Sequence, residues 1–248
     1  MASRAKLKII QQKPTDFLLR IGFSFCPFAF KLYPSLMEQL TLIGPHIRLE
    51  PLTRSHIEAL SAASAAPDPK MADPAIYNWT VVPQGIAEMT QYVETALAWQ
   101  DAGTAVPFAI VRLSDNVVIG STRYWNIERW QWPNGHPRHG NPHPDVCEIG
   151  WTWYARPAIR SGANPEAKFL MLQHAFEQWK VLRVCLHTDS RNTRSQAAME
   201  RVGFKREGII RAHKLAVDGV PRDSFRYSMT AAEWPEAKEM LLERLRVG

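Results

Sequence analysis

The sequence predicts an α/β (α+β) fold, in which strands and helices alternate along one continuous domain, residues 37–248. Two kinds of apolar spacing lead to this prediction. Segments 107–113 and 117–127 have the period of two that is typical of strands. Residues 86–100 instead repeat apolar side chains every three or four positions, as amphipathic helices do. No internal repeat interrupts this order.

The domain is expected to begin with one strand and two helices. The strand is predicted at 46–53, and the helix that follows, at 54–64, has Thr53 or Ser55 as its N-cap. The second helix, at 86–100, has one face built from Ile86, Met89, Val93, Ala96, Leu97 and Gln100.

A hairpin and a loop come next. The strands at 107–113 and 117–127 flank the turn residues Ser114, Asp115 and Asn116, which is a hairpin signal. The stretch 129–145 is too rich in Pro, Gly and Asn for regular structure, so we expect an exposed loop. Strand character returns at 146–154.

The second half continues the alternation. A helix from about Glu166 to Trp179 is predicted to bury the face formed by Phe169, Leu172, Phe176 and Trp179. Gly203 stands where a left-handed helix end is needed. The remaining elements are a strand at 182–188, a helix at 192–202, a strand at 204–210, and a hairpin at 213–230 that turns at Asp218–Gly219.

The first 36 residues differ from the rest. Residues 17–36 are apolar, but Arg20 and Lys31 leave only about ten clean residues, too few to span a bilayer. With its basic start the segment resembles a signal or transit peptide, but no convincing cleavage site follows. We interpret residues 1–36 as an upstream extension of the reading frame, before a domain that begins at Met37. The alternative is a real N-terminal arm that packs on a neighbour.

Composition limits the classes of partner. The 248 residues are 46% hydrophobic and 22% charged, which is typical of a globular protein, and the net charge of +6 is scattered along the chain. A nucleic-acid binder would need a basic, aromatic-lined stripe, and the sequence has none. Cys26, Cys147 and Cys185 lie far apart, which suggests neither disulfides nor a zinc knuckle. We expect a cytoplasmic protein with no membrane partner, as a monomer or homodimer.

The bend before the helix at Glu166 favours an anion site. It consists of Arg160, Ser161, Gly162, Ala163, Asn164 and Pro165. Small residues let a ligand approach the backbone, Asn164 is a good N-cap, and Pro165 suits the first helical position. The free N–H groups of a helix start, with the helix dipole, attract a phosphate. By itself the bend is equally well explained as an ordinary capped helix.

Four motifs together resemble the GNAT superfamily of acetyl-CoA-dependent N-acetyltransferases, and in particular its RimJ and RimL branch. They are "EIGWTW", "GANPEAK", "NTRS" and "ERVGFKREG", in the expected order and spacing. The resemblance covers about Leu40 to Pro235 and is strongest from Val146 to Gly208. It implies a mixed, strongly twisted sheet whose central strands splay apart to admit acetyl-CoA.

The resemblance also implies where acetyl-CoA binds. The pantetheine arm pairs with the backbone of the strand that ends at Trp153 and Tyr154, and the pyrophosphate lies on the amides of Arg160, Ser161, Gly162, Ala163 and Asn164. This sequence departs from the family pattern at two positions of the bend. Ile159 replaces the usual Gln or Arg, and Asn164 replaces a Gly or Ala, so Arg160 is left to supply the charge.

Two residues take catalytic roles by the same resemblance. Glu148 is placed as the general base, directly or through a water, although a salt-bridged strand carboxylate would look the same in the sequence. Ser195 is placed as the hydroxyl that protonates the leaving thiol, although it could be a polar helix residue only. Asn192 either contacts the pantetheine or caps its helix.

Other chemically suggestive residues have plainer interpretations. His136, His139 and His143 with Cys147 fit no standard zinc spacing, so we expect no metal. Cys185 alternates within a strand and is expected to fill the core rather than accept an acyl group. Trp130 and Trp132 either wall the acceptor pocket or cover the edge of the sheet.

Two functions remain open at this stage. The first is an active N-acetyltransferase that transfers acetyl directly, in a ternary complex, to a peptide N-terminus or a small amine. The second is a noncatalytic acyl-CoA-binding or regulatory module with the same fold. The presence of both Glu148 and Ser195 favours the enzyme, because a binding module needs neither. The sequence does not identify the acceptor.

Overall fold

A computed structural model describes residues 40–65 and 79–247 of the chain. The predicted extension, residues 1–36, lies outside this part. The first half contains β1 (Leu42–Ile43), β2 (Ile47–Pro51), a 3-10 turn η2 (Arg54–His56), α2 (Ile57–Ser64), α3 (Gly85–Asp101), β3 (Ala105–Arg112) and β4 (Val117–Glu128). The second half contains β5 (Val146–Tyr154), η5 (Arg156–Ala158), α4 (Ala163–Glu177), β6 (Arg183–Asp189), α5 (Thr193–Val202), β7 (Lys205–Leu215), β8 (Pro221–Thr230) and α6 (Trp234–Val247).

The eight strands form one sheet in the order β1-β2-β3-β4-β5-β6-β8-β7. Every neighbouring pair is antiparallel except β5 and β6, which run parallel. These two strands pair at Val146 with Arg183, Cys147 with Val184, and Glu148 with Cys185, and their register ends there. Beyond Glu148, β6 continues only alongside β8. The predicted mixed sheet with separating central strands is therefore confirmed.

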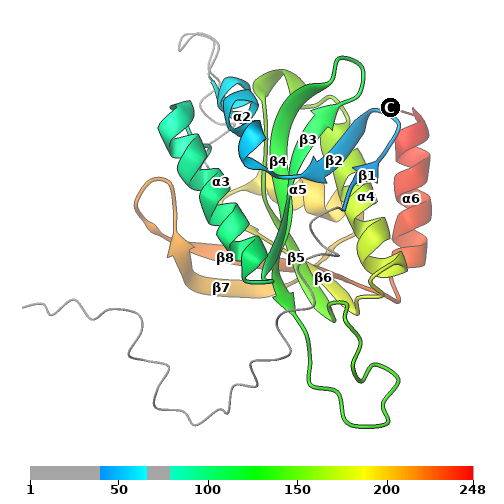
Figure 1. Cartoon of the computed structure of the whole chain (residues 1–248). Helices are drawn as coiled ribbons and strands as arrows, with labels where there is room; N and C mark the ends of the chain where they lie inside the picture. Colours follow the sequence, from blue (N-terminus) through cyan, green and yellow to red (C-terminus); the bar gives the residue numbers. More distant parts are fainter. Residues whose placement is uncertain (1–39, 66–78, 248) are drawn as a thin grey trace, which may run out of the picture. The chain divides into compact units, whose positions relative to one another are not determined.

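Helices cover the sheet on both faces (Figure 1). One face carries α4 and α6, and the main core lies beneath them, around Tyr124, Ile149, Met171 and Trp179. The other face carries α2 and α3 over a smaller core that includes Leu60, Met89 and Trp153. Because side chains alternate along a strand, β5 contributes to both cores and also supplies polar groups at the fork.

Most predicted elements are confirmed, some with changed limits. The strand predicted at 146–154 is β5. All four residues of the predicted helix face are buried, although α4 ends at Glu177 and Trp179 follows it. The strand at 204–210 and the first arm of the last hairpin are not separate, because β7 runs through both with a register shift after Ile210. Ala212 has a φ of 47° at this irregularity. Helix α6 was not predicted.

Two helix ends show how local sequence sets the boundaries. Gly203 ends α5 with a φ of 101°, as its position predicts. Thr53 caps η2 rather than the α-helix, and its backbone N–H donates to His56 Nδ1 at 3.0 Å. The alternative cap, Ser55, lies inside that turn.

Candidate active site

A pocket of about 220 Å³ lies at the fork between β5 and β6. Its lining consists of Asn126, Glu128, Val146, Cys147, Glu148, Cys185, His187, Ile210, His213 and Arg226. Cys147 belongs to the core under α4, and the neighbouring Glu148 has its side chain on the opposite face. The last β5–β6 pair thus holds the predicted base at the point where the strands part.

Glu148 has a close partner that the sequence did not reveal. Its Oε1 lies 2.9 Å from Nδ1 of His187, and the two side chains are 6% and 9% exposed. The oxygen is off the direction in which the ring nitrogen bonds, so neither nitrogen of His187 forms a hydrogen bond to a described residue. The His213 ring is 5.1 Å away, centroid to centroid.

Burial changes the titration of the groups around this carboxylate. Burial lowers the pKa of His213, and the nearby His187, Lys214 and Arg222 act in the same direction. Burial also lowers the pKa of Lys214, although Glu148 opposes that effect. These effects favour the uncharged form of the His213 ring.

Cys185 is 3% exposed, so its prediction as a buried core residue is confirmed, and it also lines this pocket. Its side chain points to the same face as His187, two residues along the strand. Burial raises its pKa, and its sulfur accepts a hydrogen bond from Arg226 at 3.5 Å. A thiol that resists ionisation is a poor nucleophile, so this environment does not favour an acyl-accepting role.

The bend between η5 and α4 differs from the predicted cap. Helix α4 begins at Ala163 and Gly162 is its N-cap, so Asn164 and Pro165 already lie within the first turn. The prediction of Asn164 as N-cap is therefore wrong. The reason is conformational: Gly162 has a φ of 82°, a left-handed geometry that glycine adopts without strain, and it turns the chain into the helix earlier.

The bend nevertheless has the donors that an anion requires. Arg160 has a φ of 68°, so two left-handed residues flank Ser161, a pattern that turns backbone N–H groups toward one concave side. Within residues 40–65 and 79–247, no acceptor pairs with the N–H groups of Gly162, Ala163 or Asn164. A Cβ on Gly162 would meet no atom within 4 Å, so the space in front of it is open.

The side chains of the bend contribute less than its backbone. The Ser161 hydroxyl donates to the carbonyl of Ala158 at 2.6 Å and is therefore engaged. Arg160 is exposed, and no described residue forms an ion pair with it. Its guanidinium is thus available for a phosphate.

Trp153 and Tyr154 lie with their side chains in the two cores, at 3% and 8% exposed. Only their backbone groups can meet a ligand. Beyond Glu148, the described residues provide no strand partner for β5 on the side where β6 departs. The edge of β5 thus fits the predicted role of pairing with an extended, amide-bearing chain such as pantetheine.

Asn192 and Ser195 lie at the start of α5, directly after β6. The side-chain oxygen of Asn192 accepts a hydrogen bond from the Ser195 backbone N–H at 3.0 Å, so its capping role is confirmed. Ser195 is half-buried, and its hydroxyl has no partner among the described residues. Neither residue lines the pocket that contains Glu148.

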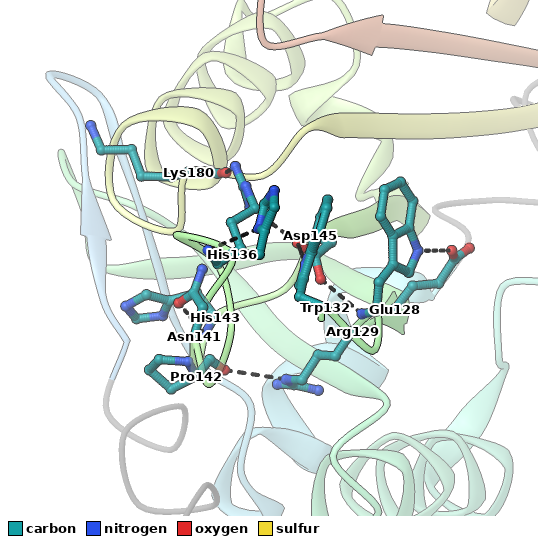
Figure 2. Close-up of polar contacts among 11 residues, drawn as sticks. Glu128, Arg129, Trp132, His136, Asn141, Pro142, His143, Asp145 and Lys180 are labelled. Carbon is teal, nitrogen blue, oxygen red and sulfur yellow. Dashed lines mark hydrogen bonds and ion pairs between the residues drawn. The ribbon is translucent and has the colours of Figure 1, made fainter. Parts of the chain in front are cut away.

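The 129–145 insert has no helix or strand, as predicted, but one buried carboxylate organises it (Figure 2). Asp145 is 3% exposed. It accepts hydrogen bonds from the Trp130 N–H at 2.8 Å, Trp132 Nε1 at 2.9 Å and Arg138 Nη1 at 3.1 Å. Arg138 also donates to the carbonyl of Lys180 at 2.6 Å, which ties the insert to the end of α4.

The aromatic and histidine residues of the insert serve this loop. His136 stacks on Trp132, with centroids 4.2 Å apart, and His139 Nδ1 lies 2.8 Å from the Trp132 carbonyl oxygen. Neither Trp130 nor Trp132 lines the pocket. Across the described ranges, no three His, Cys, Asp or Glu side chains gather as metal ligands do.

Sequence reasoning also missed a buried cation near the fork. Arg123 on β4 is 1% exposed, and its guanidinium lies over the rings of Tyr92, Trp99 and Trp151 at 4.7, 5.4 and 5.0 Å. Its Nε and Nη2 have no hydrogen-bond partner in the described residues. Cation–π contacts thus replace a carboxylate. No spacing signal links these residues, because they come from three elements.

The site can now be compared with known proteins. The profile of the Acetyltransferase (GNAT) domain matches residues 46–205, which is more than half of the chain. The chain therefore belongs to the GNAT acetyltransferase family, and the family suggested by its motifs is confirmed.

Individual relatives agree with this assignment. A curated Bacillus subtilis protein, described as "Putative ribosomal N-acetyltransferase YdaF", is 34% identical over 92 residues, or 37% of this chain and 49% of that protein. The match thus spans about half the length of this relative. A GCN5-related N-acetyltransferase from Brucella melitensis has a TM-score of 0.69 at 27% identity, over 84% of this chain and 86% of its own.

A third relative extends the likeness of the fold. RimJ of Mycobacterium smegmatis has a TM-score of 0.66 at 22% identity, and the alignment covers 84% of this chain and 96% of that one. Separately, no helix in residues 40–65 and 79–247 has the length and apolar character needed to cross a membrane.

Proposed function

We propose that this chain is an acetyl-CoA-dependent N-acetyltransferase that moves acetyl directly to a primary amine while both substrates are bound. The fork between β5 and β6 carries the proposal. It places a buried carboxylate, Glu148, at the last strand pair, and β5 continues with a free edge toward the open amides of the bend. This combination fits a thioester substrate with a phosphate at one end and a reacting carbonyl at the other.

The proposed reaction uses two residues of the chain. The amine nitrogen attacks the thioester carbonyl carbon, a C–N bond forms, and Glu148 accepts the proton that the nitrogen loses. The C–S bond then breaks, and the Ser195 hydroxyl supplies a proton to the departing sulfur and regains one from solvent water. The products are an amide and the free thiol of CoA. The alternative remains a noncatalytic acyl-CoA-binding module.

The acceptor proposed first is a peptide N-terminus, and a small-molecule amine is second. The name of the Bacillus subtilis relative points to a ribosomal protein. RimJ of Mycobacterium smegmatis, solved with a CoA disulfide, shares the fold. A ribosomal acceptor would place the enzyme in the cytoplasm, where the unpaired Cys147 and Cys185 stay reduced.

Release of free thiol from acetyl-CoA tests this function. The purified protein is incubated with peptides, polyamines, amino acids and aminoglycosides. With a working α-amine acceptor, Glu148→Gln should lower turnover by about 100-fold near pH 7, because general bases contribute on that order. Activity should partly recover above about pH 8, where the α-amine loses its own proton. Ser195→Ala should have a moderate effect that shrinks as pH rises, because a thiol of pKa about 8.5 then needs less protonation.

Glu50 provides a matched control for the base. Its carboxylate lies 2.9 Å from His56 Nε2, as Glu148 lies beside His187, but it is outside the pocket. Glu50→Gln should leave turnover within about twofold. Acetyl-CoA binding without transfer to any amine would instead favour the noncatalytic module, and full activity of Glu148→Gln from pH 6 to 9 would exclude Glu148 as the base.

A further inference from the structure

His187 lies where the fork opens, on the same face of β6 as Cys185, the last residue paired with β5. Side chains two residues apart on a strand share a face, so His187 follows Glu148 into the pocket as β5 moves away. The pair is close and shielded from water, at 2.9 Å with side chains 9% and 6% exposed. Buried imidazoles normally have hydrogen-bond partners, and this one has none in the described residues.

Charged and titratable groups from four strands surround His187. They are Glu148 on β5, His213 and Lys214 on β7, Arg222 and Arg226 on β8, and Glu128 on β4, and Cys185 adds a thiol on β6 itself. Arg226 is the cross-strand neighbour of His187, and it pairs with Glu207, Nε to Oε2, at 3.1 Å. Its charge is therefore largely balanced, and the His213 ring, 5.1 Å away between centroids, lies on the solvent side. His213 is half-buried, which gives protons a route outward.

We propose that His187 is a positioning and proton-relay residue that acts through Glu148, and that His213 leads the proton to solvent. This inference rests on the proposed function. The Glu148 carboxylate takes a proton from the attacking amine. A rotation of the His187 ring that aligns Nδ1 with the nearby Oε1 then lets the proton pass to His187. The carboxylate is thereby restored and the ring becomes an imidazolium. The imidazolium then loses one proton to His213 or water and is neutral again before the next cycle.

The pKa of a carboxyl group is much lower than that of an amine, so a carboxylate alone is a weak acceptor for the proton of the amine. Free α-ammonium groups have a pKa of about 7.7 to 8.0, free imidazole about 6.5 and a free glutamate carboxyl about 4.3. The free carboxyl and α-ammonium groups thus differ by more than three pKa units. Passing the proton on to an imidazole makes up about two of these pKa units. Efficient bases have a pKa near the working pH, so a carboxylate backed by an imidazole is the better acceptor.

Replacing His187 by glutamine tests the relay, because glutamine keeps a polar side chain but does not titrate. We expect His187→Gln to lower kcat about tenfold and to leave the KM for acetyl-CoA unchanged. His56→Gln is the matched control, since His56 lies 2.9 Å from the carboxylate of Glu50 and outside the pocket. It should retain full kcat. Thermal unfolding of both variants checks that the comparison is between folded proteins.

The pH profile separates a relay from a structural role. Two acceptors are compared, one with an α-amine and one with a lysine amine, since their pKa values differ by more than two units. The part of the pH profile that shifts when the acceptor is changed reports the titration of the acceptor amine. In the wild-type protein a second limb, which falls toward low pH, should stay in place with both acceptors, because protonated His187 accepts no proton. This limb should move to lower pH in His187→Gln, because only the protonation of the Glu148 carboxylate then stops the reaction, and a free carboxyl titrates below a free imidazole.

Chemical rescue provides an independent measurement. His187→Ala leaves space in the pocket, and added imidazole should raise its kcat several-fold, with no effect on the wild type. Equal kcat in His187→Gln and His56→Gln, or a wild-type profile without the stationary limb, would overturn the relay while acetyl transfer itself stands. A wild-type protein that acetylates no amine would overturn the proposed function, and the relay with it.

Discussion

Lys168 on α4 provides a prediction that depends on a single buried charge. Its side chain is 8% exposed, and its Nζ donates to Thr152 Oγ1 at 3.0 Å. No carboxylate among the described residues pairs with it. Burial lowers the pKa of Lys168 from 10.5 to about 7. We predict that Lys168→Met raises the free energy of unfolding at neutral pH, and that this gain disappears toward pH 10.5.

The magnitude follows from the two pKa values. Below pH 7 both states are protonated, and the folded state bears the whole penalty of burying the charge. Between pH 7 and 10.5 the unfolded chain binds more protons, so the wild-type protein gains stability as pH rises. One pKa unit is worth about 1.4 kcal/mol, so the penalty is at most roughly 5 kcal/mol near pH 7. The lost hydrogen bond to Thr152 offsets about 1 kcal/mol of the gain.

Other buried groups act in the opposite direction, so the variant must be compared with the wild type at each pH. Burial raises the pKa values of Cys147 and Tyr124. For such groups, stability is present below the unfolded pKa and is lost as pH rises above it. These losses are common to both proteins and cancel in the difference. The difference should therefore fall by about 1.4 kcal/mol per pH unit between pH 8 and 10.

Urea unfolding at pH 7, 8, 9 and 10, with a reductant present, measures this difference. Lys180→Met is the control, because Lys180 is exposed and its Nζ forms no hydrogen bond or ion pair with a described residue. Its free energy of unfolding should differ from the wild type by less than about 0.5 kcal/mol at every pH. A Lys168→Met effect that stays constant from pH 7 to 10 would refute the reasoning, since a pH-independent change reports packing and not charge.

Three further predictions concern the bend, the insert and the N-terminal segment. Gly162→Ala should destabilise the fold by about 1 kcal/mol, because alanine at a φ of 82° is strained. Calorimetry should show at least tenfold weaker acetyl-CoA binding, and unchanged affinity would contradict the phosphate role of the bend. Asp145→Asn should cost about 3 kcal/mol in urea unfolding and speed proteolysis within residues 129–145, whereas wild-type resistance would show that Asp145 does not organise the insert. A chain that starts at Met37 should bind acetyl-CoA as the full chain does, and a large loss of Tm would make residues 1–36 structural.

Local pattern in the sequence determined most of the secondary structure. The period of two in "VCEIGWTWY" predicts β5 at its observed limits, and the spacing of Phe169, Leu172 and Phe176 predicts the buried face of α4. These signals are strong because each element buries one face, and burial selects apolar residues at the period of that element. Gly203 was equally predictable, since few other residues end a helix in the left-handed region.

Short-range signals were less reliable where several residues compete for one role. Asn164 and Gly162 are both suitable N-cap residues. Which of them caps α4 depends on the direction of the backbone as it leaves η5. The strand predicted at 204–210 and the first arm of the hairpin predicted at 213–230 form one long strand, because the sheet tolerates the irregularity at Ala212. The Asp223 side chain accepts the N–H of Ala212 at 2.8 Å and helps to hold it.

The sequence by itself determined the fold class, the fork through its family motifs, and Glu148 and Ser195 as candidates. Only the tertiary structure placed His187 beside Glu148, and Arg123 among Tyr92, Trp99 and Trp151. The physical reason is that these contacts join residues far apart in the chain. Whether two such side chains meet depends on the register of β5 against β6 and on the packing of α3 over β4, and neither leaves a periodic signal in the local sequence.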